Sequence, residues 1–273
     1  MKKFPIAIQV YSVRDAASKD LRGTLQQLKS MGYDGVEFAG LYDHKPEEIK
    51  QMVEEIGLTP ISAHVPLDTL LADIPGVVAD YKKIGCQYIA IPWVSEERRP
   101  GGARYEETVA DIAKIGEEAA RQGITLLYHN HDFEFVKLNG QYGLDMLYES
   151  IPASLLQTEI DTCWVNIGGV DPAEYVLKYT GRAPLVHLKD FVGEKSENMY
   201  GLIGIADGER PKRPSNFALK PVGHGKQDFP AIIDASEKAG AQWLIVEQDN
   251  PSDDLSSLEC AKLSREYLKS IGQ

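Results

Sequence analysis

The sequence is poor in cysteine and in positive charge, and each shortage excludes a class of protein. Only three cysteines occur, Cys86, Cys163 and Cys260, and none forms a C-x-x-C motif, so neither a disulfide framework nor a thiolate metal site is indicated. Lysine and arginine number 29 against 41 aspartates and glutamates, which gives a formal net charge of -12. Phosphate backbones and anionic membranes attract clustered Lys and Arg, so we expect neither as a partner.

Long apolar runs are also missing. No apolar stretch reaches 18 residues, and the N-terminal segment MKKFPIAIQVYS is interrupted at Pro5 and Gln9, which makes it too short for a secretory signal. We therefore expect a cytoplasmic protein. The 273 residues and 43% hydrophobic content suit one large domain or two ordinary ones. No Pro, Ser or charge run divides the chain, which favours a single domain, 1–273.

Short apolar runs alternate with longer amphipathic stretches that end in glycine, such as LRGTLQQLKSMG. Strands that are apolar on both faces and alternate with helices predict a parallel sheet covered by helices. Eight such units predict a closed (β/α)8 TIM barrel, an α/β fold of about 250 residues. An open doubly wound sheet is the alternative, but no G-x-G-x-x-G follows any strand. The strand candidates are residues 6–11, 35–40, 60–65, 88–94, 124–131, 155–161, 184–190 and 242–249.

One connection is unusually long. The segment from Phe191 to Gln227 separates the seventh strand from its helix. Connections of this length are usually functional or disordered, and a loop that follows a barrel strand lies on the catalytic face. We therefore expect a lid or a loop that contacts substrate, with a surface insertion as the alternative.

Polar side chains gather where the predicted strands end, as in LLYHNHDFEF. A single strand-end His or Asp is most often a hydrogen-bonded core residue or a helix cap. Buried carboxylates and imidazoles cost several kcal/mol unless they are paired or bind a cation, so their repetition over several strands indicates a divalent-metal site. The residues concerned are Gln9, Glu37, His64, His129, His131, Glu159, Asp161, His187, Lys189, Asp190, Glu247 and Asp249.

The ordered motifs GYDGVEFAG, LLYHNHDFEF, TEIDTCW, PLVHLKD, PVGHGKQDF and LIVEQD resemble those of the xylose-isomerase-like barrel superfamily. This group comprises sugar phosphate isomerases and epimerases, inosose dehydratases and, more distantly, endonuclease four. The resemblance implies one divalent ion, Mn²⁺, Co²⁺, Zn²⁺ or Mg²⁺, held by an acid on strand five, an Asp on strand six, a His on strand seven and a Glu on strand eight. The last three match Asp161, His187 and Glu247.

The strand-five position departs from this pattern. Many relatives read Glu-Asn-His there, whereas this chain reads His129-Asn130-His131. Three arrangements are open: His129 ligates through a ring nitrogen, Glu134 reaches back with its carboxylate, or water fills the position. We favour His129, which would shift the preference of the site towards Zn²⁺, Co²⁺ or Mn²⁺ over Mg²⁺.

Other polar residues are candidates for substrate contact and proton transfer. Lys189 should point to the same side of its strand as His187, where it could neutralise an oxyanion, act as a base, or form a salt bridge. The resemblance implies sugar contacts for Glu37 and His64. The Trp93 side chain could line one wall of the pocket. The GHGK turn at 223–226, which contains His224, could cradle a phosphate with its backbone N–H groups or be an ordinary turn.

The favoured hypothesis is a metal-dependent sugar isomerase or epimerase that acts on a keto sugar or polyol, phosphorylated or not, through an enediolate. Glu247, His131 and Lys189 are the candidate catalytic residues. The same intermediate could instead expel a β-substituent, which would make the protein a dehydratase or lyase acting on a keto sugar, an inosose or a 3-keto-glycoside. A non-catalytic sugar-binding barrel is the third hypothesis.

Overall fold

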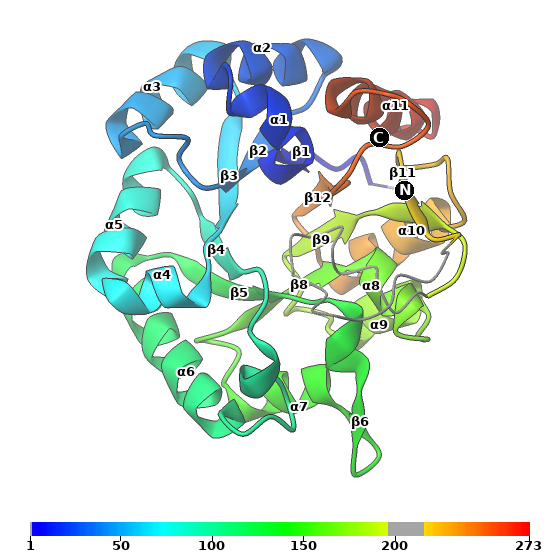
Figure 1. Ribbon diagram of the computed structural model, residues 1–273. Coiled ribbons are helices and arrows are strands. Elements are labelled where there is room, and N and C mark those ends of the chain that lie inside the picture. Colours follow the sequence, from blue (N-terminus) through cyan, green and yellow to red (C-terminus); the bar gives the residue numbers. More distant parts are fainter. Residues whose placement is uncertain (1, 196–215) are drawn as a thin grey trace.

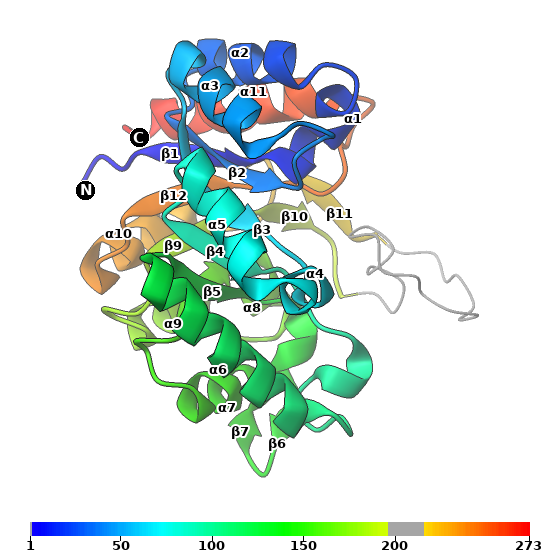
Figure 2. The same ribbon diagram turned by 90° about the vertical axis from the view of Figure 1, so that its left-hand side faces the viewer.

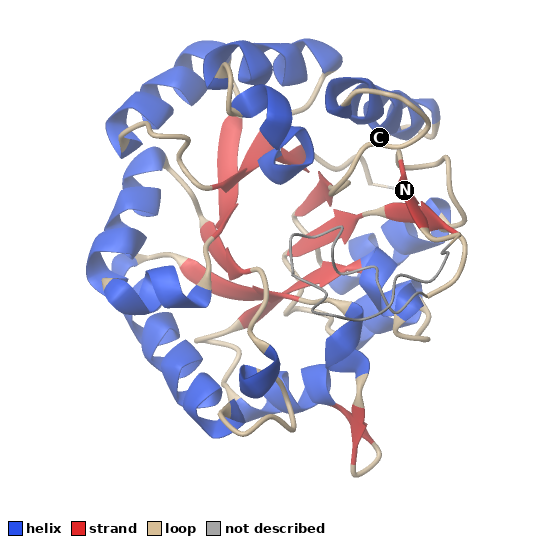
Figure 3. Cartoon of the chain, viewed as in Figure 1, coloured by secondary structure: helices blue, strands red, loops and turns tan. Residues whose placement is uncertain are grey.

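The computed structural model describes residues 2–195 and 216–273. Its centre is a closed barrel of parallel strands in the order β1-β12-β9-β8-β5-β4-β3-β2. Helices form a ring around these strands (Figures 1 and 3). The predicted (β/α)8 fold is confirmed. The barrel strands are β1 (Ile6–Gln9), β2 (Gly35–Ala39), β3 (Thr59–His64), β4 (Tyr88–Ile91), β5 (Thr125–His129), β8 (Gln157–Asp161), β9 (Leu185–Leu188) and β12 (Trp243–Val246).

All eight predicted strand positions hold a barrel strand, but most of the strands end earlier than predicted. At β4 the reason is Pro92, which follows the strand and has no N–H to donate to the ladder. The remaining helices and turns are η1 (Val10–Val13), α1 (Arg14–Ala17), α2 (Leu21–Met31), α3 (Pro46–Ile56), α4 (Leu67–Ala72), α5 (Ile74–Ile84), η2 (Glu96–Arg98), α6 (Tyr105–Gln122), η3 (Asp132–Phe135), α7 (Gly143–Ser150), α8 (Thr162–Ile167), α9 (Pro172–Lys178), α10 (Phe229–Ala239) and α11 (Ser257–Ser270).

Local signals explain where the helices begin and end. The Asp20 carboxylate accepts the N–H of Gly23 at 2.9 Å and caps α2, whose last turn is closed by Gly32 at φ 96°. The same arrangement of a left-handed glycine ends α3, α5, α6 and α10. The chain ends meet beside the barrel, where Phe4 N donates to Gln273 Oε1 at 2.9 Å (Figure 2).

Side chains inside the barrel form an apolar layer followed by a polar one. Ala7, Leu127, Leu185 and Ile245 belong to one buried apolar cluster, and each is followed two residues later by a polar side chain. Because side chains on a strand alternate between its two faces, residues i and i+2 both point inward. The apolar layer closes the interior, and the polar layer lies towards the carboxyl ends of the strands. In a barrel of this kind that end carries the active site.

The long connection after β9 is built on an antiparallel pair, β10 (Asp190–Val192) and β11 (Ala218–Lys220). A second short ribbon, β6 (Lys137–Leu138) with β7 (Gln141–Tyr142), follows β5. The predicted lid spans 191–227, and its central part, 196–215, lies outside the described residues. No helix in the described ranges is long and apolar enough to cross a membrane.

Candidate metal centre

The four predicted ligands, His129, Asp161, His187 and Glu247, meet at the carboxyl ends of β5, β8, β9 and β12. One donor atom from each lies within 4.8 Å of all the others, and all four side chains are buried. His187 Nδ1 lies 2.9 Å from Glu247 Oε2, and His129 Nε2 lies 3.7 Å from Asp161 Oδ2. We call these four residues the outer cluster.

The Asp161 carboxylate is oriented by the start of α8. Its Oδ1 atom accepts the N–H groups of Cys163 and Trp164 at 2.9 and 3.0 Å, as an N-cap. The Asn130 side chain pairs with both backbone groups of Asp161, which holds the ends of β5 and β8 together. Oδ2 is left to face His129 and Lys189. A buried carboxylate oxygen without a hydrogen bond, among two imidazoles and a second carboxylate, fits a divalent ion of the Zn²⁺, Co²⁺ or Mn²⁺ type.

Of the three arrangements that the sequence left open at strand five, the structure distinguishes ligation by His129 from ligation by Glu134. Glu134 accepts Tyr128 OH at 2.7 Å and His131 N at 2.8 Å, so both of its oxygens are occupied away from the outer cluster. Burial raises the pKa of Glu134 to about 8. His129, in contrast, directs a ring nitrogen at Asp161 and Glu247. The geometry therefore favours His129 over Glu134 as the fourth ligand.

Lys189 occupies the centre of a group of carboxylates. Its Nζ atom lies 3.1 Å from Asp161 Oδ2, 2.9 Å from Glu247 Oε2 and 3.0 Å from Asp249 Oδ2, and the side chain is fully buried. Burial alone would favour the neutral amine, but the three carboxylates outweigh it and raise the pKa of Lys189 well above its usual range. The side chain is a fixed cation beside the outer cluster.

A second set of polar groups lies on the inner side of His129 and His187, the two predicted ligand histidines. It consists of Gln9, Glu37, His64 and Glu159, and we call it the inner cluster. His64 Nε2 lies 2.7 Å from Glu159 Oε2 and 3.2 Å from Glu37 Oε1. Glu37 also accepts Gln9 Nε2 at 2.8 Å. Sequence reasoning noted Glu159 as a strand-end residue without assigning it a role, because alternation gives the side of a strand and not the contacts made there.

A cavity of about 410 Å³ opens above the outer cluster, a volume typical of a site for a small molecule. Of the predicted substrate contacts, His64 and Trp93 line it, and Trp93 is 38% exposed. The fully buried Glu37 is not on the cavity wall, and His224 is an exposed loop residue away from it. The lining consists of Tyr11, Ala39, Gly40, His64, Pro66, Pro92, Trp93, His129, His131, Glu247 and Asp249.

His131 faces this cavity and is held by aromatic neighbours. Its ring stacks on Phe133 with centroids 5.1 Å apart, and the Arg99 guanidinium lies over the Phe133 ring at 3.5 Å from its centroid. Burial, with a smaller contribution from His129 and Lys189, lowers the pKa of His131 well below its usual range. The ring is therefore uncharged at neutral pH.

The GHGK turn does not form an open phosphate cradle. The N–H groups of Gly223 and Gly225 donate to Asp190 Oδ2 at 3.0 and 2.7 Å, and Gln227 N donates to Oδ1 at 3.2 Å. A Cβ at position 225 would collide with the Asp190 carboxylate, which explains the glycine. The geometry favours the ordinary turn over the phosphate cradle, because a carboxylate of the same chain already occupies the anion position.

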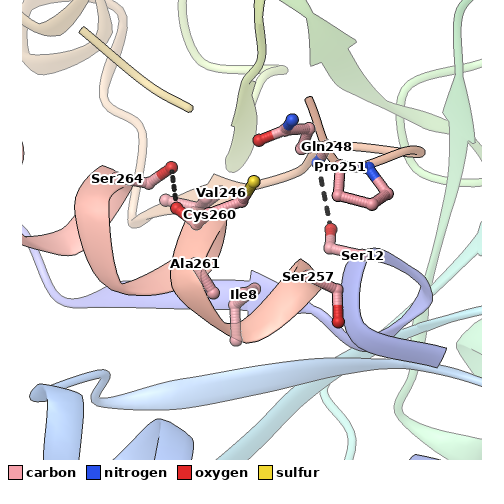
Figure 4. A pocket seen from close by; sticks show the side chains of 9 residues that line it. All are labelled: Ile8, Ser12, Val246, Gln248, Pro251, Ser257, Cys260, Ala261 and Ser264. Carbon is pink, nitrogen blue, oxygen red and sulfur yellow. Dashed lines mark hydrogen bonds between the residues drawn. The ribbon is translucent and has the colours of Figure 1, made fainter. Parts of the chain in front are cut away.

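A second cavity lies outside the barrel, between β1, the segment after β12, and α11 (Figure 4). Its volume of about 10 Å³ can hold no more than one water molecule. Gln248 N donates to Ser12 Oγ at 3.0 Å on one wall, and Ser264 Oγ donates to Cys260 O at 3.0 Å on the other. The volume excludes a sugar, so this cavity is a packing gap between strand and helix.

Fold and outer cluster together define a (β/α)8 barrel with a candidate divalent-metal centre at its carboxyl end. The chain belongs to the xylose isomerase-like TIM barrel family, whose model matches residues 25–271. A rhizopine catabolism protein of Rhizobium meliloti is 24% identical, with 91% of this chain and 80% of that protein covered.

Two further comparisons extend this picture. An inosose dehydratase of Clostridium botulinum is 29% identical, but the match covers 58% of this chain and only 51% of that protein. A solved structure of a sugar phosphate isomerase/epimerase from Parabacteroides distasonis superposes with a TM-score of 0.79 at 19% identity, over 99% of this chain and 96% of the other. At that identity the likeness shows the fold alone.

Proposed function

We propose that this protein is a divalent-metal-dependent enzyme that removes a proton next to the carbonyl of a keto sugar or polyol, as an isomerase or epimerase. The observation that carries the proposal is the outer cluster with the Lys189 ammonium beside it, both buried beneath one cavity. His129, Asp161, His187 and Glu247 would hold the ion. When bound, a divalent ion supplies positive charge that lowers the barrier to removing the α proton.

The charges of this set suit a reaction that develops negative charge. Asp161, Glu247 and Asp249 surround a single ammonium, that of Lys189, so three formal negative charges face one positive charge. A divalent ion brings the set to neutrality. Lys189 then acts as a fixed cation next to the enediolate oxygens rather than as the base, because all three of its carboxylate neighbours favour the charged form.

His131 is the best placed of the candidate bases. Glu247 Oε2 lies 2.9 Å from both His187 Nδ1 and Lys189 Nζ, and the same carboxylate would hold the ion, so Glu247 is less suited to take a proton. His131 lines the cavity and is not part of the outer cluster, so holding the ion does not engage it. The stack on Phe133 fixes the ring, so that a proton can be taken at a constant position.

The described part of the cavity favours an uncharged substrate. Glu247 and Asp249 line it, and no Lys or Arg does among residues 2–195 and 216–273. The turn that might have bound a phosphate is occupied by Asp190. Pro66, Pro92 and Trp93 give one wall an apolar surface, on which the C–H face of a sugar ring can pack. We therefore infer an unphosphorylated sugar or cyclitol.

A second candidate is a dehydratase or lyase that expels a hydroxyl or glycosyl group from the carbon next to the deprotonated one. The curated relatives support it, because an inosose dehydratase of Geobacillus kaustophilus is 22% identical over 89% of this chain and 85% of that protein. The two candidates share the proton abstraction and differ in the fate of the enediolate. Isomerisation returns the proton to carbon, whereas elimination loses water or a sugar.

The test combines metal analysis with deuterium exchange. Purified protein is analysed for bound metal before and after chelation and refilling with Mn²⁺, Co²⁺, Zn²⁺ or Mg²⁺. It is then incubated in D₂O with unphosphorylated ketoses, inososes and 3-keto-glycosides and with their phosphates. We expect about one ion per chain, a deficit in the His187→Ala variant, and exchange of the α proton only with unphosphorylated compounds.

The products decide between the candidates. A deuterated isomer or epimer supports the isomerase or epimerase, and an elimination product supports the dehydratase or lyase. Retention of a sugar without any bound ion and without exchange would show a sugar-binding barrel instead. Exchange of the α proton only with phosphorylated compounds would contradict the inference of an unphosphorylated substrate.

A further inference from the structure

Glu159 lies where a single carboxylate can contact both ligand histidines. It belongs to β8, two residues before Asp161, so both side chains point into the barrel. Glu159 is fully buried and does not line the cavity. Its Oε2 atom lies 3.3 Å from His129 Nδ1 and 3.5 Å from His187 Nε2.

Each ligand histidine has one nitrogen towards the outer cluster and the other towards the inner cluster. His187 directs Nδ1 at Glu247 and Nε2 at Glu37 and Glu159, at 2.9 and 3.5 Å. His129 directs Nε2 at Asp161 and Nδ1 at Glu159. In both rings the nitrogen that faces the inner cluster is not the one that would bind the ion.

The chemistry of a neutral imidazole decides which nitrogen carries the proton. The ring has one N–H donor and one lone pair, and a metal needs the lone pair. A carboxylate can only accept a hydrogen bond, so it selects the tautomer whose N–H points at it. A carboxylate on the inner side therefore leaves the lone pair of His129 directed at the outer cluster, whereas His187 has a carboxylate on each side, with Nδ1 2.9 Å from Glu247 Oε2 and Nε2 2.9 Å from Glu37 Oε1.

Glu159 does this for His129, whose Nδ1 it meets at 3.3 Å, while its 3.5 Å approach to His187 Nε2 is not a hydrogen bond. Glu37 Oε1 approaches His187 and His64, and Gln9 donates to the same oxygen. The same Glu159 oxygen lies 2.7 Å from His64 Nε2. Glu159 is thus fixed before any ion binds.

We infer that Glu159 is a positioning residue that holds His129 in the tautomer required to ligate a divalent ion. The inference rests on the metal centre proposed above and goes beyond it, since Glu159 is not one of the four residues of the outer cluster; Glu159 also belongs to a second group that could hold an ion, with His64, His129 and His187. Removing such a partner typically weakens metal binding 10- to 100-fold. His64 and Gln9 would act through the carboxylates that they contact.

The test measures metal affinity and histidine tautomers in the full chain. Zn²⁺ affinity is measured by competition with a chromophoric chelator for the wild type, Glu159→Gln and Glu134→Gln. Tautomers are read from ¹⁵N chemical shifts of the histidine rings in the apo and Zn²⁺-loaded proteins. Glu134 is an equally buried glutamate that contacts neither ligand ring, so its substitution is the matched control.

We expect Glu159→Gln to bind Zn²⁺ 10- to 100-fold more weakly and to show mixed tautomers at His129, while Glu134→Gln keeps the wild-type affinity. An affinity within twofold of wild type with unchanged tautomers would overturn the inference and leave the metal centre standing. Two ions per chain in the wild type, reduced to one in Glu159→Gln, would also overturn it, because Glu159 would then be a ligand.

A wild type that binds no ion under any condition would remove the metal centre and this inference with it. If Glu159→Gln fails to fold, Glu159→Asp keeps the charge but withdraws the oxygen from the His129 ring. The same loss of affinity is expected from that variant.

Discussion

Lys189 Nζ lies 2.9 Å from Glu247 Oε2, so a proposed metal ligand is also the partner of a buried ammonium. The two cations, lysine and metal, would share the same carboxylate. Sharing one carboxylate weakens its attraction to each cation, and it places both cations next to the bound substrate. The arrangement predicts that the lysine serves the reaction and not the affinity for the ion.

The substitution Lys189→Met tests this separation. We expect turnover to fall roughly 100-fold or more, because a preorganised cation next to the developing negative charge is lost. Metal affinity should stay the same or rise, since a competing positive charge is removed. Turnover is measured at saturating metal, and affinity by competition with a chelator. A drop in affinity of more than tenfold would instead make Lys189 a structural support of the outer cluster.

Asp161→Asn should show the opposite pattern. The asparagine side chain can keep accepting the N–H groups of Cys163 and Trp164 through its oxygen, so α8 retains its cap. The negative charge that faces the ion is lost. We expect metal binding and activity to become undetectable while the melting temperature stays within a few degrees. Normal turnover in this variant would remove Asp161 from the site.

The sequence predicted the barrel and the convergence of the four proposed ligands, for one physical reason. Parallel strands apolar on both faces leave few places for polar side chains, and the strand ends meet at one rim. His129, Asp161, His187 and Glu247 are therefore brought together by topology alone. Contacts that depend on distances of a few tenths of an ångström could not be predicted in this way.

Three residues show where the prediction stops. Glu134 and His129 were both possible ligands, and only the Tyr128 hydroxyl and the turn of η3 direct Glu134 elsewhere. A sequence does not show which of the two ring nitrogens of a histidine faces which neighbour. The role proposed for Glu159 therefore has no sequence signal beyond its spacing from Asp161.

The turn at 223–225 illustrates a different limit. Glycines that expose backbone N–H groups are typical both of a phosphate site and of a cradle for an internal carboxylate. Only the position of Asp190, more than thirty residues earlier in the chain, distinguishes the two.

Asp190→Ala should destabilise the protein. The carboxylate accepts hydrogen bonds from Phe191, Gly223, Gly225 and Gln227, and its removal leaves several backbone donors without an acceptor. We expect a loss of roughly 2–4 kcal/mol in the free energy of unfolding, measured by urea denaturation. Asp190→Asn, which keeps one acceptor oxygen, should lose less. Equal stability of wild type and Asp190→Ala would contradict the conclusion that the Asp190 carboxylate stabilises the turn at 223–225.

The burial of Glu134 should make the stability of the protein depend on pH, independently of the metal. Burial raises its pKa in the folded protein to about 8, from an ordinary value of 4.5. Between these values the folded state binds more protons than the unfolded state, so the stabilisation is complete below pH 4.5 and is lost as the pH rises towards 8. The slope approaches about 1.4 kcal/mol per pH unit within that window.

The Glu134→Gln variant isolates this contribution, because it cannot ionise. Unfolding by urea at about pH 5.5, 7 and 8.5, with a chelator present to remove metal effects, should show wild-type stability falling with pH and a flatter profile for the variant. The exposed Glu54, 65% accessible along its side chain, provides the matched control, and Glu54→Gln should keep the wild-type slope. Identical slopes for wild type and Glu134→Gln would mean that Glu134 is ionised in the folded protein at neutral pH.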